Sequence, residues 1–513
     1  MSDLVVVSDD DERRAARGLS AGGRWTREEW RMPGMAGSSA RRASLVALLA
    51  GLLSACAVGP DFVKPEPEMP PAYRSELTPS EAASFADEPW FDVFNDLTLR
   101  GLIDEALASN YDLRTAAARV EQAQHQVGVT RSELFPQVGY QGQAARGKSF
   151  LGPNIDNQTF NTFLGAFNLA WELDVWGRIR RATEASEAVL YATDDVRRGV
   201  VLSLVSAVAT SYFTLQELDL QLEIARNTTQ SFTETLELFT RRYKGGVDSK
   251  LSVERARAAR AQAAATIPQT EQQIVQQENA LCTLLGRSPG PVNREPLMTL
   301  ASVPPQTPPG LPSELLRRRP DVLQAERLIE ASNALIGVSV ANFFPRLGLT
   351  TLYGGQSSDL ENVVKTPGVI WVIAGTLMGP IFQGGRLTES YREQKADWEA
   401  TKATYMQTVL NALTEVSNAL IAQQKLEEVR VEQEVEVDAL RESVRLALLR
   451  YNGGLSTYYE VLEAQQQLFP AELGLAQTDL NRILAVVDLY SALGGGWEAN
   501  DMPVDPGFWP HGP

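Results

Sequence analysis

Residues 178–242 read RIRRATEASEAVLYATDDVRRGVVLSLVSAVATSYFTLQELDLQLEIARNTTQSFTETLELFTRR and contain no proline. Apolar side chains recur there at alternating steps of four and three residues: Val201, Val205, Val208, Tyr212 and Leu215. This spacing predicts a continuous helix with a coiled-coil-like seam, although the core of a helical bundle would show the same period. At 1.5 Å per residue the helix would be roughly 95 Å long. Such a length favours an extended tube or rod over a single globular core.

The second half of the chain repeats the first at an offset of 208 or 209 residues. The landmarks are Asp112 with Asp321, Phe135-Pro136 with Phe344-Pro345, Gly177-Arg178 with Gly385-Arg386, Tyr243 to Gly246 with Tyr451 to Gly454, and Leu285-Gly286 with Leu493-Gly494. A near-constant offset indicates a duplicated unit. A second long helix is therefore expected over 386–450, with the seam Val409, Leu413, Val416 and Leu420. Each half then comprises a helix, a strand pair, a long helix, a glycine turn and a return helix. Pro268 and Pro470 are expected to kink the return helices.

A change of period marks the strands. Residues 159–173 read TFNTFLGAFNLAWEL and place Phe163, Gly165, Phe167, Leu169 and Trp171 on one face. An apolar, aromatic face alternating with a more polar one is typical of a lipid-facing barrel wall. Residues 367–378, PGVIWVIAGTLM, occupy the equivalent place, and the stretches from Val138 and Leu347 supply the partner strands.

About four strands per chain cannot close a barrel. An open strand edge in lipid costs several kcal/mol for each unpaired backbone group. The chain is therefore predicted to share its barrel with copies of itself, and the composition leaves the number of copies open.

The N-terminal region has the pattern of a lipoprotein signal peptide. Residues 41–56, RRASLVALLAGLLSAC, place two arginines before a short apolar run that ends in Leu53-Ser54-Ala55-Cys56. This ending resembles the lipobox of bacterial lipoproteins, which implies a lipid on Cys56 and sorting to the outer membrane. The expected organisation begins with an over-extended start (1–31), a signal peptide (32–55) and a lipidated proline-rich tether (56–98). A first repeat follows (99–290), with a strand pair (137–173) and a long helix (178–242). After a linker (291–311) comes a second repeat (312–496), with a strand pair (346–378) and a long helix (386–450), and then a flexible tail (497–513).

Composition excludes several classes of function. The net charge of −17 argues against nucleic-acid binding. With two His and two Cys, no cluster for a zinc or transition-metal site is expected, and no cofactor is predicted. Residues 142–149 match the phosphate-binding pattern GxxxxGK[ST], but Pro153 follows closely where a helix is required, so the match is interpreted as a surface-loop coincidence. The sequence contains no HExxH or GxSxG motif, and the protein is predicted not to be an enzyme.

Four stretches resemble the TolC-like outer membrane efflux family, and within it the lipoprotein branch often called NodT-type. They are Pro89-Trp90-Phe91 through LIDEALASNYDLRTAAARVEQA, LPSELLRRRPDVLQAE (311–326), WELDVWGRIRRA (171–182) and GPIFQGGRL (379–387). The resemblance implies a mainly α fold with a transmembrane β part. In it, a long helical barrel continues from a shared 12-stranded β-barrel in a homotrimer. It also implies a periplasmic adaptor, or membrane fusion protein, and an inner-membrane RND pump as partners.

The two glycine turns are the first candidate site. Glycine permits the positive φ needed where a helix ends, and both turns lie at the far ends of the long helices. The resemblance implies that these tips receive the adaptor, through Tyr243, Gly245, Gly246, Tyr451, Gly453 and Gly454. Ser252 and Ser456 stand where some family members place an Asp and an Arg that lock the closed aperture, so a closing salt bridge of that type is not expected here.

The second candidate site is an acidic pair just past the second turn. Glu460 and Glu463 lie three residues apart on one helical face. Repeated around a symmetric trimer, an inward-facing pair would form carboxylate rings that filter charge; a pair of solvated glutamates is the alternative.

These features predict the exit duct of a tripartite efflux system. It would be lipid-anchored in the outer membrane, extend into the periplasm, and passively release small toxic compounds or drugs from an RND-type pump. The alternatives are the outer membrane component of a type I protein secretion system and a pore-less periplasmic scaffold lipoprotein.

Overall fold

The computed structural model describes residues 57–74, 96–148, 159–294, 310 and 312–495. The described residues all belong to one compact unit. The proposed leader, Cys56 and the tail over 497–513 lie outside the described residues.

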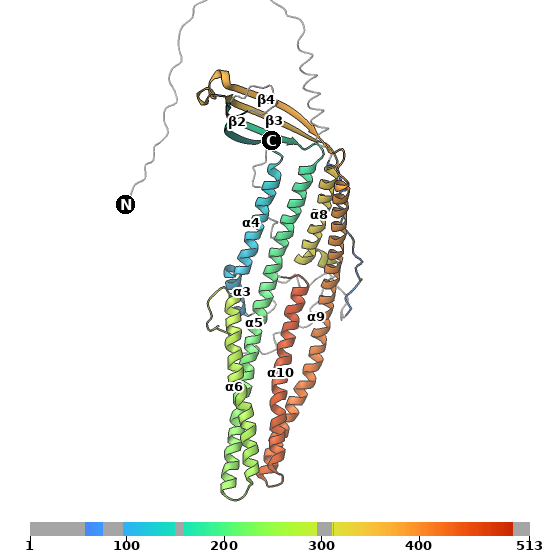
Figure 1. The fold of residues 1–513 in the computed structure, drawn as a ribbon. Helices are drawn as coiled ribbons and strands as arrows, with labels where there is room; N and C mark the ends of the chain where they lie inside the picture. Colours follow the sequence, from blue (N-terminus) through green and yellow to red (C-terminus); the bar gives the residue numbers. More distant parts are fainter. Residues whose placement is uncertain (1–56, 75–95, 149–158, 295–309, 311, 496–513) are drawn as a thin grey trace, which may run out of the picture. The chain divides into compact units, whose positions relative to one another are not determined.

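Each half of the chain supplies helices, two strands and a long helical hairpin (Figure 1). The first half contains α3 (Leu97–Ser109), α4 (Tyr111–Ser132), β1 (Gln137–Lys148), β2 (Thr159–Leu173), α5 (Arg178–Lys244) and α6 (Lys250–Leu284). The second contains η3 (Pro312–Glu314), α7 (Leu315–Arg318), α8 (Pro320–Ala341), β3 (Arg346–Ser357), η4 (Leu360–Asn362), η5 (Thr366–Gly368), β4 (Val369–Met378), α9 (Arg386–Asn452) and α10 (Tyr458–Ala492). Both long helices begin where the sequence predicts and end two residues later than expected.

The helical stretch between Leu99 and the Phe135 turn is divided at Asn110, and its counterpart in the second repeat is divided at Arg319. Both residues have extended backbone, with φ, ψ of −62°, 135° and −76°, 121°. The Asn110 amide donates to the Leu284 carbonyl over 2.9 Å, and the Arg319 guanidinium donates to the Ala492 carbonyl over 2.8 Å. Each break turns a side chain toward the end of the return helix of its own half.

The two seams meet in one core along the upper part of the hairpins. In the first seam Val208, Tyr212 and Leu215 are completely buried, and they pack in the same cluster as Val409 and Val416 of the second. By length and composition alone, α5 contains a stretch apolar enough to cross a membrane. Because the buried apolar residues between Leu204 and Leu218 belong to this cluster, α5 is a core helix of the hairpins.

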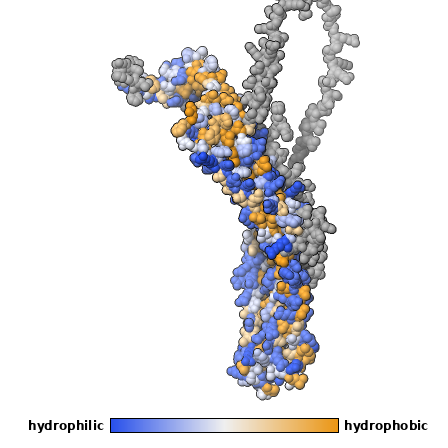
Figure 2. All heavy atoms as spheres, turned by 90° about the vertical axis from the view of Figure 1, so that its right-hand side faces the viewer, coloured by the Kyte–Doolittle hydropathy of each residue, from blue (hydrophilic) through white to orange (hydrophobic). Residues whose placement is uncertain are grey.

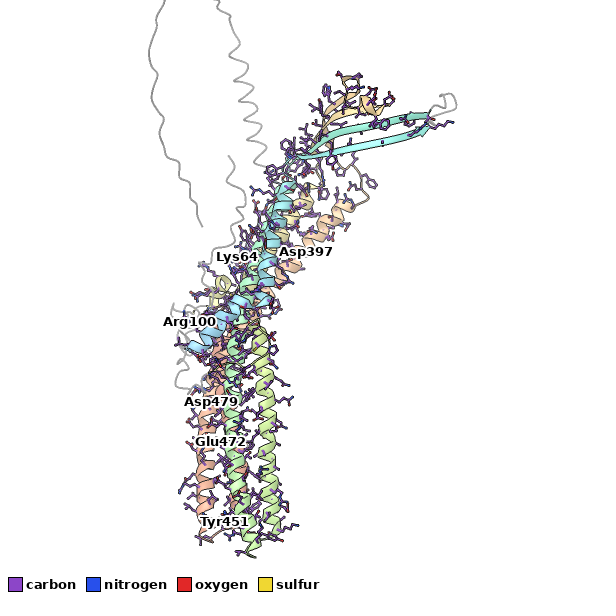
Figure 3. The ribbon with its side chains drawn as sticks, turned by 90° about the vertical axis from the view of Figure 1, so that its left-hand side faces the viewer. Lys64, Arg100, Asp397, Tyr451, Glu472 and Asp479 are labelled. Carbon is purple, nitrogen blue, oxygen red and sulfur yellow. The ribbon has the colours of Figure 1, made fainter. Side chains whose placement is uncertain are left out.

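Ion pairs join the two helices of the second hairpin. Arg430 of α9 lies 2.9 Å from Asp479 of α10, and Arg441 of α9 lies 3.0 Å from Glu472 of α10 (Figure 3). Pro268 and Pro470 lie inside α6 and α10, which both continue through them.

The strands form one antiparallel sheet in the order β1-β2-β3-β4. Residues 142–148 of the GxxxxGK pattern lie within β1 and pair with β2. The interpretation of this stretch as a surface loop was therefore wrong. An extended strand does not present the convergent backbone amides of a helix N-terminus with which such a motif holds phosphate.

One face of the sheet is aromatic across all its strands. Tyr140 pairs with Phe167, Phe167 with Tyr353, and Tyr353 with Trp371, so the four rings stand in a row. All four side chains are exposed, by 60–86% of their surface. Apolar side chains are prominent around the sheet in Figure 2. An exposed aromatic face is unusual for a surface in water and typical of a membrane wall.

The start of the described chain, residues 57–74, crosses from the first repeat to the second. The Val58 amide donates to the Trp176 carbonyl over 3.0 Å, and the Asn333 amide on α8 donates to the Pro60 carbonyl over 3.1 Å. Lys64 then pairs with Glu326 of α8 over 2.6 Å (Figure 3). The segment is thus held against the helices as an extended strap, consistent with the expected tether.

Candidate functional site

The two turns that follow α5 and α9 have the same geometry. Each ends its helix with paired backbone bonds: the Gly246 amide donates to Tyr243 and the Gly454 amide to Tyr451, both over 3.0 Å. Only the second glycine of each turn has positive φ, +71° at Gly246 and +70° at Gly454. Gly245 and Gly453 have φ of −80° and −77°. The expectation that each glycine pair serves positive φ therefore holds for one residue in each turn.

Three aromatic rings join the two hairpins next to the tips. Phe239 of α5 lies against Tyr458 of α10 and Tyr451 of α9, with ring centroids 3.7 and 5.8 Å apart. The Arg242 guanidinium of α5 lies 4.8 Å from the centre of the Tyr451 ring. Burial raises the pKa of both tyrosine hydroxyls, so they remain neutral near pH 7. The tips of one chain are therefore held together mainly by apolar and cation–π contacts.

The two tip tyrosines differ in their surroundings. Tyr451 is buried at the end of the hairpins opposite the sheet (Figure 3), whereas 44% of the Tyr243 surface is exposed. Apolar side chains are also exposed around both turns: Val247, Leu251, Leu449, Leu455 and Tyr459. A cluster of exposed apolar groups at a molecular end is a candidate contact surface for another protein.

Glu460 and Glu463 both lie exposed at the start of α10. Glu460 faces back across the turn, where its carboxylate lies 3.4 Å from the Arg450 guanidinium of α9. Within the described residues Glu463 forms no ion pair. The two carboxylates thus share a helical face but differ in charge compensation.

The two serines lie near the same turns. Ser249 caps α6, and its hydroxyl lies 3.1 Å from that of Ser252. The Ser456 hydroxyl is buried without a hydrogen-bond partner among the described residues.

At the foot of the sheet, charged and aromatic groups fix the start of α5. Arg178 binds Glu172 of β2 and Glu133 of the α4–β1 turn, each over 3.0 Å. The Trp176 ring stacks on Phe344 at 4.7 Å and donates to the Pro345 carbonyl over 2.8 Å. The first repeat is thereby docked onto the turn that precedes β3.

Sequence reasoning missed Asn110 and Arg319 as joint residues. The repeat offset relates them, and Pro320 directly follows Arg319. This was the available signal, but their acceptors lie more than 170 residues away in sequence.

Paired helical hairpins that carry an open sheet with one aromatic face define a duct-forming outer membrane protein. The chain belongs to the outer membrane efflux protein family, whose profile matches residues 102–287 and 311–495, one match in each repeat.

Individual relatives extend the match to nearly the whole chain. The probable efflux pump outer membrane protein TtgC of Pseudomonas putida is 33% identical over 463 residues, which cover 88% of this chain and 95% of TtgC. The cation efflux system protein CusC of Escherichia coli is 31% identical over 455 residues, covering 87% and 97%. The solved outer-membrane channel OprN aligns with a TM-score of 0.80 at 31% identity, covering 86% of this chain and 100% of OprN.

These matches confirm the predicted family, the outer membrane location and the role as an efflux exit duct. The family consists of channels, so its members act by conducting solutes and carry out no reaction. The mainly helical fold with one sheet agrees with the solved channels.

Proposed function

We propose that three copies of this chain form a passive duct, with a 12-stranded barrel in the outer membrane that continues as a helical tunnel into the periplasm. The observation that carries the proposal is the open sheet: among the described strands β1 and β4 each have one neighbour, and the exposed aromatic face is typical of a lipid-facing wall. Edge backbone groups in lipid must be paired, and only strands of further copies can pair them. Four strands from each of three copies complete the barrel.

The duct would receive small toxic compounds or drugs from an RND-type pump through a periplasmic adaptor. TtgC and CusC are named as parts of an efflux pump and a cation efflux system, which supports this class of partner. The adaptor would dock at the tips formed by Tyr243, Gly245, Gly246, Tyr451, Gly453 and Gly454. The exposed apolar groups around these turns support this assignment. A lipid on Cys56 would anchor the strap that begins at residue 57.

The orientation of the sheet gives a direct test with a matched pair of variants. Phe167 and Asn168 are neighbours on β2 and point to opposite faces. Phe167→Arg places a charge in lipid, which costs about 2–4 kcal/mol near the bilayer centre, whereas Asn168→Arg places it in the lumen. We expect F167R to reduce the detergent-extracted trimer and its conductance in planar bilayers, and N168R to retain both.

Two measurements on the wild-type protein distinguish a duct from the pore-less scaffold. Native mass measurement is expected to give a trimer, and planar bilayers are expected to show ion conductance. A monomer without conductance would refute the duct. If F167R and N168R assembled equally well, the assignment of Phe167 to the lipid face and Asn168 to the lumen would be wrong.

We further propose that the aperture opens by movement of the return helices about the tips. Gln465 of α10 donates to Ser231 of α5 over 3.0 Å, which makes this pair suitable for a lock between the hairpins. A disulfide in Ser231→Cys with Gln465→Cys is expected to lower conductance, and a reductant should restore it. Either single variant serves as the control. Unchanged conductance in the oxidised double variant would exclude this mode of opening.

A further inference from the structure

The outward positions of the sheet, those that share a face with Phe167, carry charge at one end of β1. Side chains alternate between the two faces, and the pairing register relates the strands to one another. Among the described strands the outward positions contain no acidic residue, and their only charged residues are Arg146 and Lys148. Both are exposed, and neither forms an ion pair with another described residue. In a chain with a net charge of −17, this basic pair is a local exception that favours an anion.

The basic pair lies at the height where a lipid-facing wall ends. The helices join the sheet at the starts of β1 and β3 and at the ends of β2 and β4, so the hairpin ends point away from the helices. Arg146 is nine residues from Gln137, the first residue of β1. At about 3.4 Å per residue and a tilt of about 40°, that stretch rises about 23 Å, close to the apolar band of about 25 Å in membrane barrels. In the proposed duct the pair therefore reaches the outer leaflet.

The loop between β3 and β4 lies on the same face at the same height. Gly165 and Gly355 are opposite each other in the β2–β3 ladder and both belong to the outward positions. A Cβ on Gly355 would lie 1.7 Å from the Val363 carbonyl oxygen, and a Cβ on Gly165 would lie 3.7 Å from Cγ1 of Val363. The loop is therefore folded back onto the aromatic face. Gly355 is nine residues from the start of β3, as Arg146 is from the start of β1.

The loop presents apolar side chains rather than free cations. Leu360 and Val364 are 68% and 90% exposed. Lys365 pairs with Glu361 over 3.3 Å, and Asp359 is the remaining charged residue between β3 and β4. The positive charge of this surface therefore comes from β1, whereas the loop contributes apolar contact.

We propose that this surface binds lipid A, the phosphorylated glycolipid of the outer leaflet. Its phosphates lie at Arg146 and Lys148, and its acyl chains lie along the aromatic wall and the loop. The assignment rests on the proposed duct, whose barrel places this face in lipid. Arg and Lys form charge-assisted hydrogen bonds with phosphate, and each basic residue near an anionic membrane surface adds to the attraction.

The choice of a glycolipid follows from the breadth of the surface. β1 and β3 are two strand spacings apart, about 10 Å, and the outward side of β2, with Phe163, lies between them. A glycerophospholipid has one phosphate and two acyl chains. Lipid A has a phosphate at each end of a disaccharide and several acyl chains, so it can cover a broad apolar surface beside two cations.

The test is a titration of the purified trimer with diphosphoryl lipid A in detergent, with bound lipid counted by native mass spectrometry. Arg146→Gln with Lys148→Gln is expected to weaken binding at least about tenfold. Dephosphorylated lipid A should bind the wild type as weakly as diphosphoryl lipid A binds this variant. Equal affinity of the wild type and the variant, or of the wild type for both forms of lipid A, overturns the site. Wild-type affinity for phosphatidylglycerol equal to that for lipid A overturns the choice of the glycolipid.

A charge-transfer variant is the matched control. Adding Gln143→Lys and Ala145→Arg to the double variant restores the net charge but places both cations on the luminal face of β1. Binding should stay as weak as in the double variant. Recovery of wild-type affinity would show that net charge, rather than the outward basic pair, attracts the lipid.

A pair of glycine variants tests the loop. Gly355→Ala displaces Val363 and is expected to weaken lipid A binding by roughly threefold through lost apolar contact. Gly142→Ala, on the outward side of β1 with nothing within 4 Å of its Cβ, should leave binding unchanged. Equal affinity of these two variants would remove the loop from the site.

Conductance and native mass of the same preparations separate this site from the duct itself. The basic-pair variants should remain conducting trimers, because the substituted side chains lie at the outer end of the wall. A conducting wild-type trimer that binds no lipid A overturns the site and leaves the proposed duct intact. A monomer without conductance overturns both.

Discussion

Asn110 and Arg319 occupy equivalent places in the duplicated unit and make equivalent contacts through different side-chain groups. Each interrupts a helix and donates to a carbonyl near the end of the return helix of its half. Asn110 also caps α4 by accepting from the Leu113 amide over 2.9 Å. Arg319 instead carries a charge, which Asp321 and Glu415 neutralise, each over 2.7 Å. Both side chains act as tertiary connectors that only the folded chain reveals.

Arg319→Met preserves most of the side-chain bulk but removes its hydrogen bonds. The buried Ala492 carbonyl then loses its charged donor, which is expected to cost about 2 kcal/mol of unfolding free energy. Thermal unfolding of the purified protein followed by helical circular dichroism would measure the loss. Arg392→Met is the control because the Arg392–Glu389 pair is 69% exposed on both sides; less than about 0.5 kcal/mol is expected there. If both variants lost the same unfolding free energy, Arg319 would not be the residue that holds the start of α8 to the end of α10.

Asp195 of α5 makes stability depend on pH. Burial raises the pKa of its carboxyl to about 6, Arg198 and Arg327 act in the opposite direction, and Asp194 and Glu326 raise it further. In the unfolded chain the carboxyl titrates near pH 4. The folded state therefore binds more protons between about pH 4 and 6, so its stability falls as the pH rises through that window.

Asp195→Asn should flatten this part of the stability curve. The variant is expected to lose less stability than the wild type between pH 4 and pH 6.5, measured by thermal unfolding in one detergent. Asp438→Asn, whose side chain is 70% exposed, should follow the wild-type curve. A variant curve as steep as the wild type would show that another group titrates in this range.

At the scale of elements, the two glycines of each hairpin turn differ in backbone conformation. Gly454 has φ of +70° and open space where a Cβ would stand, with nothing within 4 Å, whereas Gly453 has φ of −77°. Gly454→Ala is therefore expected to destabilise the tip by about 1 kcal/mol through backbone strain alone. Gly453→Ala should have little effect. Hydrogen exchange of the backbone amides at the tip would be measured in both variants. Equal protection in both would show that the positive φ of Gly454 does not make this position more sensitive than Gly453.

The elements themselves were largely predictable from sequence. Each long helix lacks proline and is bounded by glycine, signals that are local, and each begins at the predicted arginine. The break at Arg319 has a local signal, because Pro320 follows and disfavours helical backbone at the residue before it. The contacts of Asn110 and Arg319 with carbonyls of a distant helix were not predictable. The GxxxxGK stretch was misplaced for a related reason: its glycines resemble a loop, yet pairing with β2 extends them as a strand.

At the scale of the whole molecule, sequence indicated which residues gather at the tips but not their partners. The offset placed both turns at the ends of the long helices. It could not show that Tyr451 is buried against Phe239 while Tyr243 remains exposed, since that difference arises from contacts between hairpins. The acidic pair illustrates the same limit. Spacing placed Glu460 and Glu463 on one face, and only the folded turn brings Arg450 to one of them.

This difference predicts how each carboxylate contributes to the charge of the assembled aperture. In a trimer Glu463 would add three charges that no described side chain of its own chain neutralises, whereas Arg450 offsets Glu460. Glu463→Gln should therefore lower the cation-to-anion permeability ratio in planar bilayers by roughly twofold or more, and Glu460→Gln by less.

The effect should weaken as ionic strength rises, because the Debye length falls from about 10 Å at 0.1 M to about 3 Å at 1 M. Reversal potentials measured under a salt gradient at both strengths would test this. Arg450→Gln provides the converse control: it frees the Glu460 carboxylate and should increase cation preference. If Glu460→Gln had the larger effect, or if neither variant changed the ratio, Glu463 would not line the aperture, and its carboxylates would be the solvated outer groups of a helical tip.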